Sequence, residues 1–301
     1  MISSLNPSGQ QFLNNLNRIN QQMQKAQTEV ASGLKITQVS DAPDQISALL
    51  QARANLSAAQ QIGTNLGQTK AETDAGEQAL ESAVQLFDRV QTLAAQGNNS
   101  TETADSRNTL ADEVGSILEQ LGGLAGTQVE GRYIFSGDAD QTAPYTIDLT
   151  QSNPVSNYQG ATATRVAEHP NGTTFPVSLT AQTIFDSADP TTNVFGAVEG
   201  LRTALESNDD TQIQNALGGL SKVATYLNSQ LSFYGTVQNK VAEATDFGQT
   251  LQTQLQTQIG NIQNADMTQS ILELTQAQTQ QQAALQSRAQ LPRTTLFDFL
   301  G

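Results

Sequence analysis

The sequence predicts a mainly α protein: a long antiparallel helical bundle or coiled coil built from both chain ends, with a β-hairpin and a small β-rich inserted domain. Three observations support this fold class. Apolar residues recur in steps of three and four over residues 5–34, and again over residues 211–263. Between these halves, residues 131–190 lose this spacing and become rich in Thr, Pro, Gly and Asn. Neither helical half can bury its apolar stripe alone, so we expect the halves to pair across the insert and to place both termini at one end of a rod.

The first helical segment extends from about Ser8 to Ser32, and its apolar stripe is a heptad seam. Asn and Gln occupy most of the remaining positions, which leaves only one narrow apolar face. An isolated helix of this kind is marginal in water, so it requires a partner helix. The C-terminal segment 271–300 is the obvious partner in the same chain. The seam consists of Leu5, Phe12, Leu16, Ile19, Met23, Ala26 and Val30.

Three further helical stretches follow in the first half of the chain. After a connector, Ser40 or Asp41 can cap the next helix and Pro43 suits its first turn, and we expect that helix to continue towards Ala71. A second stretch covers residues 80–94 and is stopped by the Gly-Asn-Asn-Ser run at 97–100. A third covers residues 110–124 and ends in a glycine-rich run.

A β-rich insert is predicted from residue 131 onward. Residues 132–137 read as a strand, because aromatic and β-branched residues are bounded by glycines. Shorter strand-like pieces cover residues 145–149, 163–166 and 174–179. Helical periodicity is absent until about Val194.

The second helical half contains one very long helix, from about Thr211 to Gln263, with Asp210 or Thr211 as its cap. The run Asn-Ala-Asp at 264–266 breaks or bends it, and the glutamine-rich residues 267–291 form a last helical segment that Pro292 ends. We therefore expect five parts: a terminal-layer helix at 1–40, the first rod half with its hairpin at 41–137, the insert at 138–192, the second rod half at 193–264, and a terminal-layer helix at 265–301.

Composition excludes several classes of protein. The net charge of −15 and the sequence pI of about 4.3 argue against nucleic acid as a partner, because phosphates would be repelled. The chain has no cysteine, so neither a disulfide nor a cysteine-ligated metal site is possible. No run of about 18 apolar residues is present, so we expect no membrane insertion. No basic-then-apolar leader opens the chain, so export would use a route that cleaves no such signal.

No catalytic constellation emerges from the residues. His169, the only histidine, lies in a Pro-Asn-Gly turn and has no second histidine or cysteine with which to bind a metal. Asp138 and Asp140 resemble the start of a calcium loop, but the required glycine and distal glutamate are missing. We therefore expect a structural protein without a cofactor, and not an enzyme. By itself, the heptad pattern is equally well explained by core packing within one molecule.

Three motifs carry a family resemblance, and they occur in the family's order. Residues 31–43 (ASGLKITQVSDAP), 131–137 (GRYIFSG) and 265–278 (ADMTQSILELTQAQ) resemble the corresponding segments of bacterial flagellins and their relatives. The insert at 138–192 matches no motif, as is typical of a variable outer domain. The motif residues that we single out are Ser32, Gly33, Leu34, Asp41, Pro43, Tyr133, Phe135, Gly137, Ala265 and Asp266.

Within the family, two details resemble the members that join the hook to the filament rather than the filament flagellins. The Ser-Asp-Ala-Pro run at 40–43 is close to the Ser-Asp-Pro of junction members, although Ala42 separates the last two residues. The ending Leu-Phe-Asp-Phe-Leu at 296–300 is close to the junction ending Leu-Phe-Asp-Tyr-Leu.

The resemblance implies terminal segments that are largely disordered in the monomer and fold into coaxial helices on assembly. It implies secretion to the hook–filament junction of the flagellum, with the following partners: hook-associated protein 1, flagellin, other copies of this chain in a ring, a cytoplasmic export chaperone and the type III export apparatus. The expected assembly interface consists of Leu5, Phe12, Leu16, Ile19, Met23, Val30, Ile271, Leu274, Leu285, Leu296, Phe297, Phe299 and Leu300.

Two alternatives remain open at this point. A filament flagellin would polymerise alone into long filaments, and the ending at 296–300 argues against it. An exported coiled-coil adhesin would bind a host ligand through the β insert, and its loss would leave filament attachment unchanged.

Overall fold

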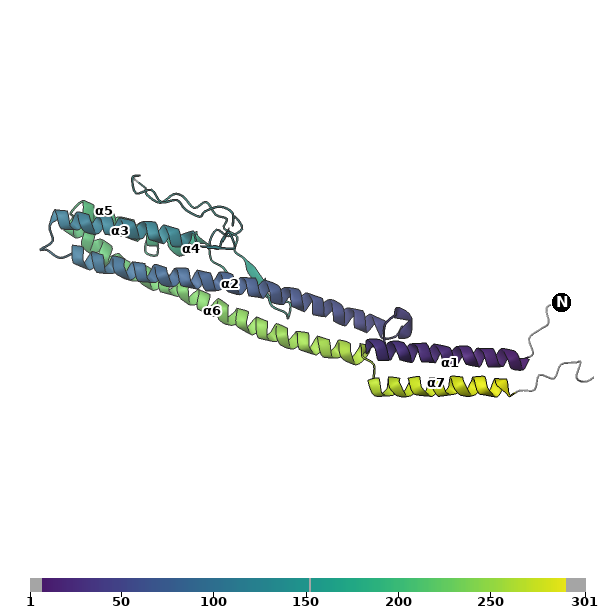
Figure 1. Ribbon diagram of the computed structural model, residues 1–301. Helices are drawn as coiled ribbons and strands as arrows, with labels where there is room; N and C mark the ends of the chain where they lie inside the picture. The colour runs from purple at the N-terminus through teal and green to yellow at the C-terminus, as the bar shows by residue number, and fades with distance from the viewer. Residues whose placement is uncertain (1–6, 152, 291–301) are drawn as a thin grey trace, which may run out of the picture. The chain divides into compact units, whose positions relative to one another are not determined.

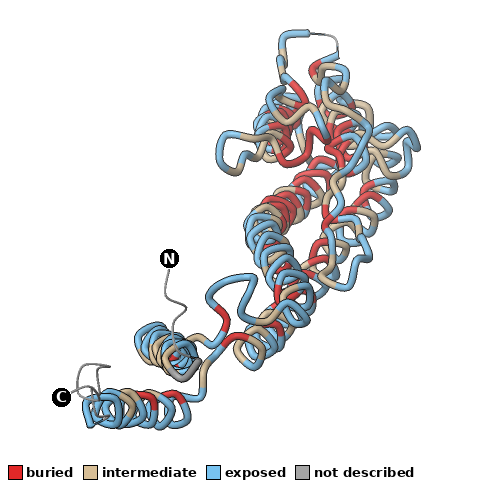
Figure 2. The backbone as a smooth tube through the Cα atoms, turned by 90° about the vertical axis from the view of Figure 1, so that its right-hand side faces the viewer, coloured by how far each residue is buried: buried red, intermediate tan, exposed pale blue. Residues whose placement is uncertain are grey.

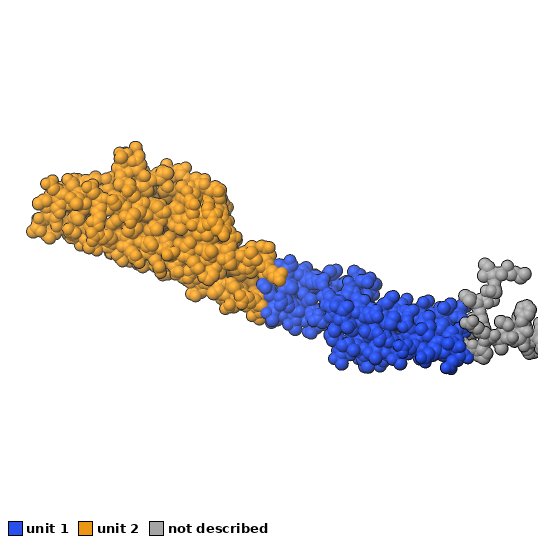
Figure 3. All heavy atoms as spheres, in the orientation of Figure 1, with its two compact units in different colours: residues 1–57, 252–301 blue, residues 58–251 orange. Residues whose placement is uncertain are grey.

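The computed structural model describes residues 7–151 and 153–290 (Figure 1). Contacts within the chain divide it into two compact units, which Figure 3 shows in different colours: unit 1 comprises residues 1–57 and 252–301, and unit 2 comprises residues 58–251. The order of elements is α1 (Pro7–Ser32), η1 (Val39–Asp41), α2 (Ile46–Gly97), α3 (Ala104–Ala125), β1 (Gln128–Val129), β2 (Arg132–Tyr133), β3 (Val166–Glu168), β4 (Thr174–Pro176), α4 (Ala181–Phe185), α5 (Val194–Glu206), α6 (Asp210–Gln263) and α7 (Met267–Ala289). The mainly helical fold class with small hairpins is confirmed.

Unit 1 contains α1 and α7, together with the first turns of α2 and the last turns of α6. α1 and α7 lie side by side in Figure 1 and are antiparallel, because Glu29 near the end of α1 contacts Ser270 near the start of α7. Further along the pair, Asn20 contacts Gln281. The two ends of the chain therefore supply one helix pair, as the heptad seam predicts.

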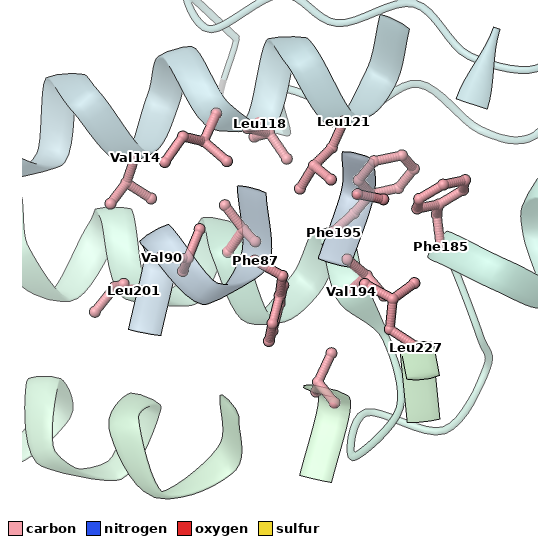
Figure 4. Packing of buried hydrophobic residues seen from close by; sticks show 14 of the residues in the cluster. Phe87, Val90, Val114, Leu118, Leu121, Phe185, Val194, Phe195, Leu201 and Leu227 are labelled. Carbon is pink, nitrogen blue, oxygen red and sulfur yellow. The ribbon is translucent and has the colours of Figure 1, made fainter. Parts of the chain in front are cut away.

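Unit 2 is built on an apolar core between α2, α3, α5 and α6 (Figure 4). α2 and α6 are antiparallel, and Gln91 of α2 donates to the carbonyl of Leu220 in α6. Figure 2 shows burial concentrated along these helices. The core includes Phe87, Val90, Val114, Leu118, Leu121, Phe185, Val194, Phe195, Leu201 and Leu227.

Two small antiparallel hairpins complete unit 2. In the first, β1 pairs with β2, and the turn uses positive φ angles at Glu130 (51°) and Gly131 (76°). In the second, β3 pairs with β4 and covers a smaller cluster. There Ala167 and Val177 pack with Leu66 of α2 and with Val237 and Val241 of α6. The insert thus folds back over the two long helices of its own unit.

Polar caps fix the ends of several helices. Thr103 accepts the N–H of Ser106 at the start of α3, and Asn193 accepts the N–H of Gly196 at the start of α5. Asp266 accepts the N–H groups of Thr268 and Gln269 at the start of α7. The break predicted at residues 264–266 is therefore confirmed and has a capping cause.

The helix start predicted at Ser40 to Pro43 is wrong in detail. The Asp41 carboxylate turns back and accepts the N–H groups of Thr37 and Gln38, so it closes the η1 turn instead of capping α2. Pro43 lies in the turn before α2, which begins at Ile46. The stretches expected to end near Ala71 and to restart near Leu80 form one helix, because the Gly and Thr residues between them are tolerated where packing favours helix.

The insert is less regular than its sequence predicts. The strand expected over residues 132–137 is limited to Arg132–Tyr133, because the following residues turn into the core. The piece at 145–149 contributes only one bridge, between Ile147 and Val155. α4 was not predicted, since five residues are too few to establish periodicity. Its Ala181, Ile184 and Phe185 join the main core of unit 2.

Candidate assembly surface

The predicted seam of α1 is the face that meets α7. Ile19 and Ala26 are buried, at 8% and 1% exposed. The other described seam residues are half-buried: Phe12, Leu16, Met23 and Val30. Because α7 is the helix that contacts α1, these residues form the inner face of the terminal pair.

The face of α7 that meets α1 is made of small and polar residues. Ser270 and Ala277 are buried, at 2% and 4% exposed, and Leu274 between them is half-buried. Ser270 donates to the Glu29 carboxylate over 2.9 Å, and Gln281 donates to the side-chain oxygen of Asn20 over 2.8 Å. The register of the pair is therefore fixed mainly by hydrogen bonds.

The larger apolar residues of α7 lie outside this contact. Ile271 and Leu285 are each 51% exposed, and Met267 is 41% exposed. At 100° per residue these three lie within 40° of one another on the helix, and they form what we call the outer stripe of α7. Leu272 is also exposed. Of the predicted interface residues in α7, Leu274 is thus the half-buried one, and about half of the surface of the outer stripe stays exposed.

The first and third motifs meet where α1 and α7 begin to pair. Gly33 ends α1 with a φ of +71°, which favours glycine, and its carbonyl accepts the N–H of Ala265 over 2.9 Å. Leu34 and Asn264 form an antiparallel bridge. Ser32 caps the same turn, because its hydroxyl accepts the N–H of Leu34. Two segments from opposite ends of the sequence therefore form one structural joint.

Asp41 organises the connector that follows the joint. Its carboxylate also accepts the hydroxyl of Thr37, and hydrogen bonds from the backbone N–H groups of Gln38 and Thr37 lower the pKa of Asp41 below its ordinary value. Pro43 is exposed in the next turn. These two motif residues belong to the connector, and the hydrogen bonds of Asp41 shape it.

The second motif belongs to the core of unit 2. Phe135 is fully buried, and its ring makes edge contacts with Phe185 and Tyr234 at centroid distances of 6.4 and 6.1 Å. Gly137 has a φ of +61°, and a Cβ there would collide with two backbone carbonyls. Tyr133 is half-buried in β2. This motif has a packing role, distinct from the terminal pair.

Several predicted interface residues lie outside the described residues. These are Leu5 near the N-terminus and Leu296, Phe297, Phe299 and Leu300 near the C-terminus.

Sequence reasoning missed the polar centre of the joint. Gln263 is 9% exposed, and its side-chain oxygen accepts the Arg53 guanidinium over 2.8 Å. Its amide donates to the carbonyl of Ile36 over 3.4 Å. Glutamine is so frequent in this chain that no signal distinguished this residue; its place directly before the helix break was the only available hint.

The described residues contain no group of three or more His, Cys, Asp and Glu side chains that could hold a metal ion. His169 lies in the β3–β4 turn, and its ring contacts Phe247 at 5.1 Å between centroids. Within residues 7–151 and 153–290, no helix combines the length and apolar character needed to span a membrane.

Comparison with known families gives two matches that cover most of the chain. Residues 2–140 match the bacterial flagellin N-terminal helical region, and residues 217–300 match the bacterial flagellin C-terminal helical region. The first match includes α1 and the joint segment 33–36, and the second includes α7 and the segment 261–265.

The individual relatives have low sequence identity to this chain. A flagellin from Clostridium tyrobutyricum is 25% identical over 229 residues, which are 72% of this chain and 60% of that protein, so the chain spans less than two thirds of the relative's length. A flagellar hook-associated protein from Vibrio parahaemolyticus has a TM-score of 0.65 at 20% identity, covering 74% of this chain and 100% of that one. The flagellar hook-associated protein 3 of Legionella pneumophila has a TM-score of 0.62 at 15% identity, covering 72% and 99%. These two structures show a shared fold.

Proposed function

We propose, from the premise that this chain belongs to the bacterial flagellin family, that it is a structural adaptor of the flagellum. It joins the hook, through hook-associated protein 1, to the flagellin filament, in the manner of hook-associated protein 3. The observation that carries this proposal is the terminal helix pair, whose outer stripe of Met267, Ile271 and Leu285 is exposed in the single chain.

The outer stripe supports assembly through the terminal helices. Exposed large apolar residues on one face of a helix are typical of a surface that a partner covers. In the proposed ring, other copies of this chain cover the stripe. Hook-associated protein 1 and flagellin dock at the two ends of the ring.

The chemistry of the pair supports folding on docking. The buried residues of α7 at its inner face are Ser270 and Ala277, and on α1 only Ile19 and Ala26 of the described seam are buried, so the apolar area that stabilises the contact is modest. A helix pair of this kind gains most of its order from a partner. We propose that α1 and α7 are largely disordered in the free chain and become protected from hydrogen exchange in the ring. Full protection in the free chain would contradict this part of the proposal.

The charge distribution supports the same surface. Residues 1–57 and 252–301 carry six Lys and Arg and six Asp and Glu, so the whole net charge of −15 belongs to residues 58–251. Copies can therefore pack through unit 1 without net repulsion, whereas unit 2 favours solubility.

The remaining parts of the proposal follow from the family. The chain is exported through the type III apparatus without a cleaved leader, and a cytoplasmic chaperone binds its C-terminal segment before export. It has no enzymatic activity and no cofactor, and its mature location is the hook–filament junction.

The decisive experiment is electron microscopy of a strain that lacks this protein, with flagellin assayed in the medium. Hooks without filaments, together with monomeric flagellin in the medium, support the adaptor. Normal filaments contradict it and favour an adhesin. Absence of flagellin from both cells and medium identifies the chain as the filament subunit.

A pair of variants tests the outer stripe in the same strain. We expect Ile271→Asp with Leu285→Asp to abolish filament attachment, because two carboxylates would be buried without partners. The matched control is Gln280→Asp with Ser287→Asp, which adds the same charge to exposed positions of α7 about 180° away. Equal loss in both variants would contradict the role of the stripe.

A filament flagellin is the second candidate, and the curated relative from Clostridium tyrobutyricum favours it. Purified chain that polymerises alone into long filaments would support this candidate over the adaptor.

A further inference from the structure

The joint between the two terminal motifs pairs backbone segments that are distant in the sequence. The N–H of Lys35 donates to the carbonyl of Gln263 over 2.8 Å, and the N–H of Ala265 donates to the carbonyl of Gly33 over 2.9 Å. Leu34 and Asn264 lie opposite each other between these two bonds. The joint therefore closes a loop that contains most of the chain.

Gln263 connects three segments at this joint. Its backbone carbonyl accepts from Lys35, its side-chain oxygen accepts from Arg53 at the start of α2, and its amide donates to Ile36, which is 227 residues away. Because the residue is only 9% exposed, these bonds are partly shielded from competing water. Loss of the side chain would leave the Arg53 guanidinium and the Ile36 carbonyl with one partner fewer.

Beyond the joint, three side-chain contacts follow one another along α1 and α7, beside the apolar seam of α1. Glu29 meets Ser270 first, Asn20 meets Gln281 next, and the Arg288 guanidinium lies 5.7 Å from the ring centroid of Phe12. No pair in this series buries two large apolar side chains. Each contact therefore contributes little free energy to pairing unless the helices are already aligned.

Alignment is the costly step for two helices at opposite ends of a chain. Closing a long loop costs entropy, and starting a helix costs more than extending it. A closed joint removes the entropy cost of loop closure, and it holds the last turn of α1 and the first turn of α7 at a high effective concentration. Pairing then proceeds from one neighbouring contact to the next.

We infer that the Gln263 joint is the nucleus from which α1 and α7 pair outward, first at Glu29 and Ser270 and last at Phe12 and Arg288. This inference rests on the proposed folding of the terminal helices on docking. It adds that docking extends a pairing which the chain itself registers whenever the joint is closed, and which a permanent closure of the joint would strengthen.

A disulfide tests the inference directly, because the chain contains no cysteine. Leu34 and Asn264 form the antiparallel pair whose flanking residues make the backbone bonds, a geometry in which the Cα atoms are about 4.5 Å apart. That separation is within the range of a disulfide. In the purified full chain with Leu34→Cys and Asn264→Cys, we expect oxidation to raise amide-exchange protection about tenfold in residues 22–32 and 267–277. The reduced sample is the control.

A second variant tests the nucleus without a cross-link. We expect Gln263→Ala to lower protection in both α1 and α7, with Gln258→Ala, an exposed glutamine of the same helix, as the matched control. Unchanged protection after oxidation, or equal effects of the two alanine variants, would overturn the inference.

The outcomes remain separable from those of the proposed function. If the wild-type free chain is already fully protected, folding on docking fails. In that case, the Gln263→Ala variant still tests the inference. Loss of hydrogen-exchange protection in both α1 and α7 supports the joint as the nucleus, whereas loss limited to residues 33–36 overturns it. Filament attachment in the deletion strain reports on the adaptor independently of these exchange measurements.

Discussion

Unit 2 and the terminal pair of unit 1 are both helical, but different interactions hold them. In unit 2, α3 and α5 pack Leu118, Leu121 and Leu201 at 0% exposed. In the terminal pair, the buried residues of α7 are Ser270 and Ala277. Figure 2 shows the same contrast, with continuous burial in the bundle and mostly exposed surface on the helices next to the marked chain ends. Unit 2 has an extended apolar core of its own, whereas the terminal pair of unit 1 buries only a narrow face.

The polar networks of the two units differ in the same way. Arg107 in unit 2 is 4% exposed and bonds to Gly97, Asn208 and Asp210, so it ties α3 to the ends of α2 and α6 around a completed apolar core. Gln263 in unit 1 performs a similar connection where little apolar area is available. In unit 2 the buried polar residue adds hydrogen bonds to an apolar core. In unit 1 the buried polar residue connects segments that have little apolar core between them.

The largest expected effect is in the core of unit 2. Phe135→Ala removes a fully buried ring and its two aromatic edge contacts, so we expect the free energy of unfolding to fall by about 3–5 kcal/mol. Urea denaturation of the purified chain measures this change. Phe247→Ala is the control, because that ring is 45% exposed. Similar losses in both variants would remove the distinction between a packed core and its surface.

The buried arginine should have the next largest effect. Arg107→Met keeps much of the apolar stem but removes the donors to Gly97 and Asn208, and we expect a loss of about 2 kcal/mol. The Arg89→Met variant breaks an exposed pair with Glu113 and should cost under about 1 kcal/mol. Thermal unfolding of both variants compares them. An equal change would show that burial does not strengthen this network.

A smaller, local effect is expected in the terminal pair. Ile19→Ala removes the largest buried seam residue of α1, and we expect the pair to lose about 1.5 kcal/mol while unit 2 keeps its stability. Hydrogen exchange resolved along the chain distinguishes the two regions. Leu13→Ala, at a 46% exposed position of the same helix, is the control. Loss of protection in α3 or α5 would contradict the independence of the two units.

The smallest effect concerns pH. Hydrogen bonds lower the pKa of Asp41 in the folded connector, so its stabilising contribution is complete above the ordinary carboxyl pKa of 3.8. That contribution decreases as the pH falls through the lowered pKa, because protonation weakens acceptance from Thr37 and Gln38. The protection factors of these two amides, taken relative to the intrinsic exchange rate at each pH, should therefore fall below pH 3.8, while the protection factors of α3 stay constant. An Asp41 side-chain titration at the ordinary pKa would contradict this assignment.

Much of the fold could be predicted because its signals are local. Steps of three and four residues predicted α1 and α6 close to their observed bounds and α3 from its second turn onward, and the Asn-Ala-Asp run predicted the break between α6 and α7. The cap at Asp266 and the positive φ of Gly33 depend on residues within one helical turn. The three family motifs were likewise recognisable without any tertiary information.

The sequence by itself therefore determined the helical halves, their breaks and the seam of α1, since periodicity and capping act over a few residues. Only the tertiary structure decided which of many similar residues are buried. Gln263 and Ser270 look like any exposed polar residue in the sequence, and Ile271 and Leu285 look like core residues. Their burial depends on Ile36, Glu29 and the face that α1 covers, more than 200 residues away in the chain. Distant pairing, and not local propensity, separated the inner face of the terminal helices from their exposed surface.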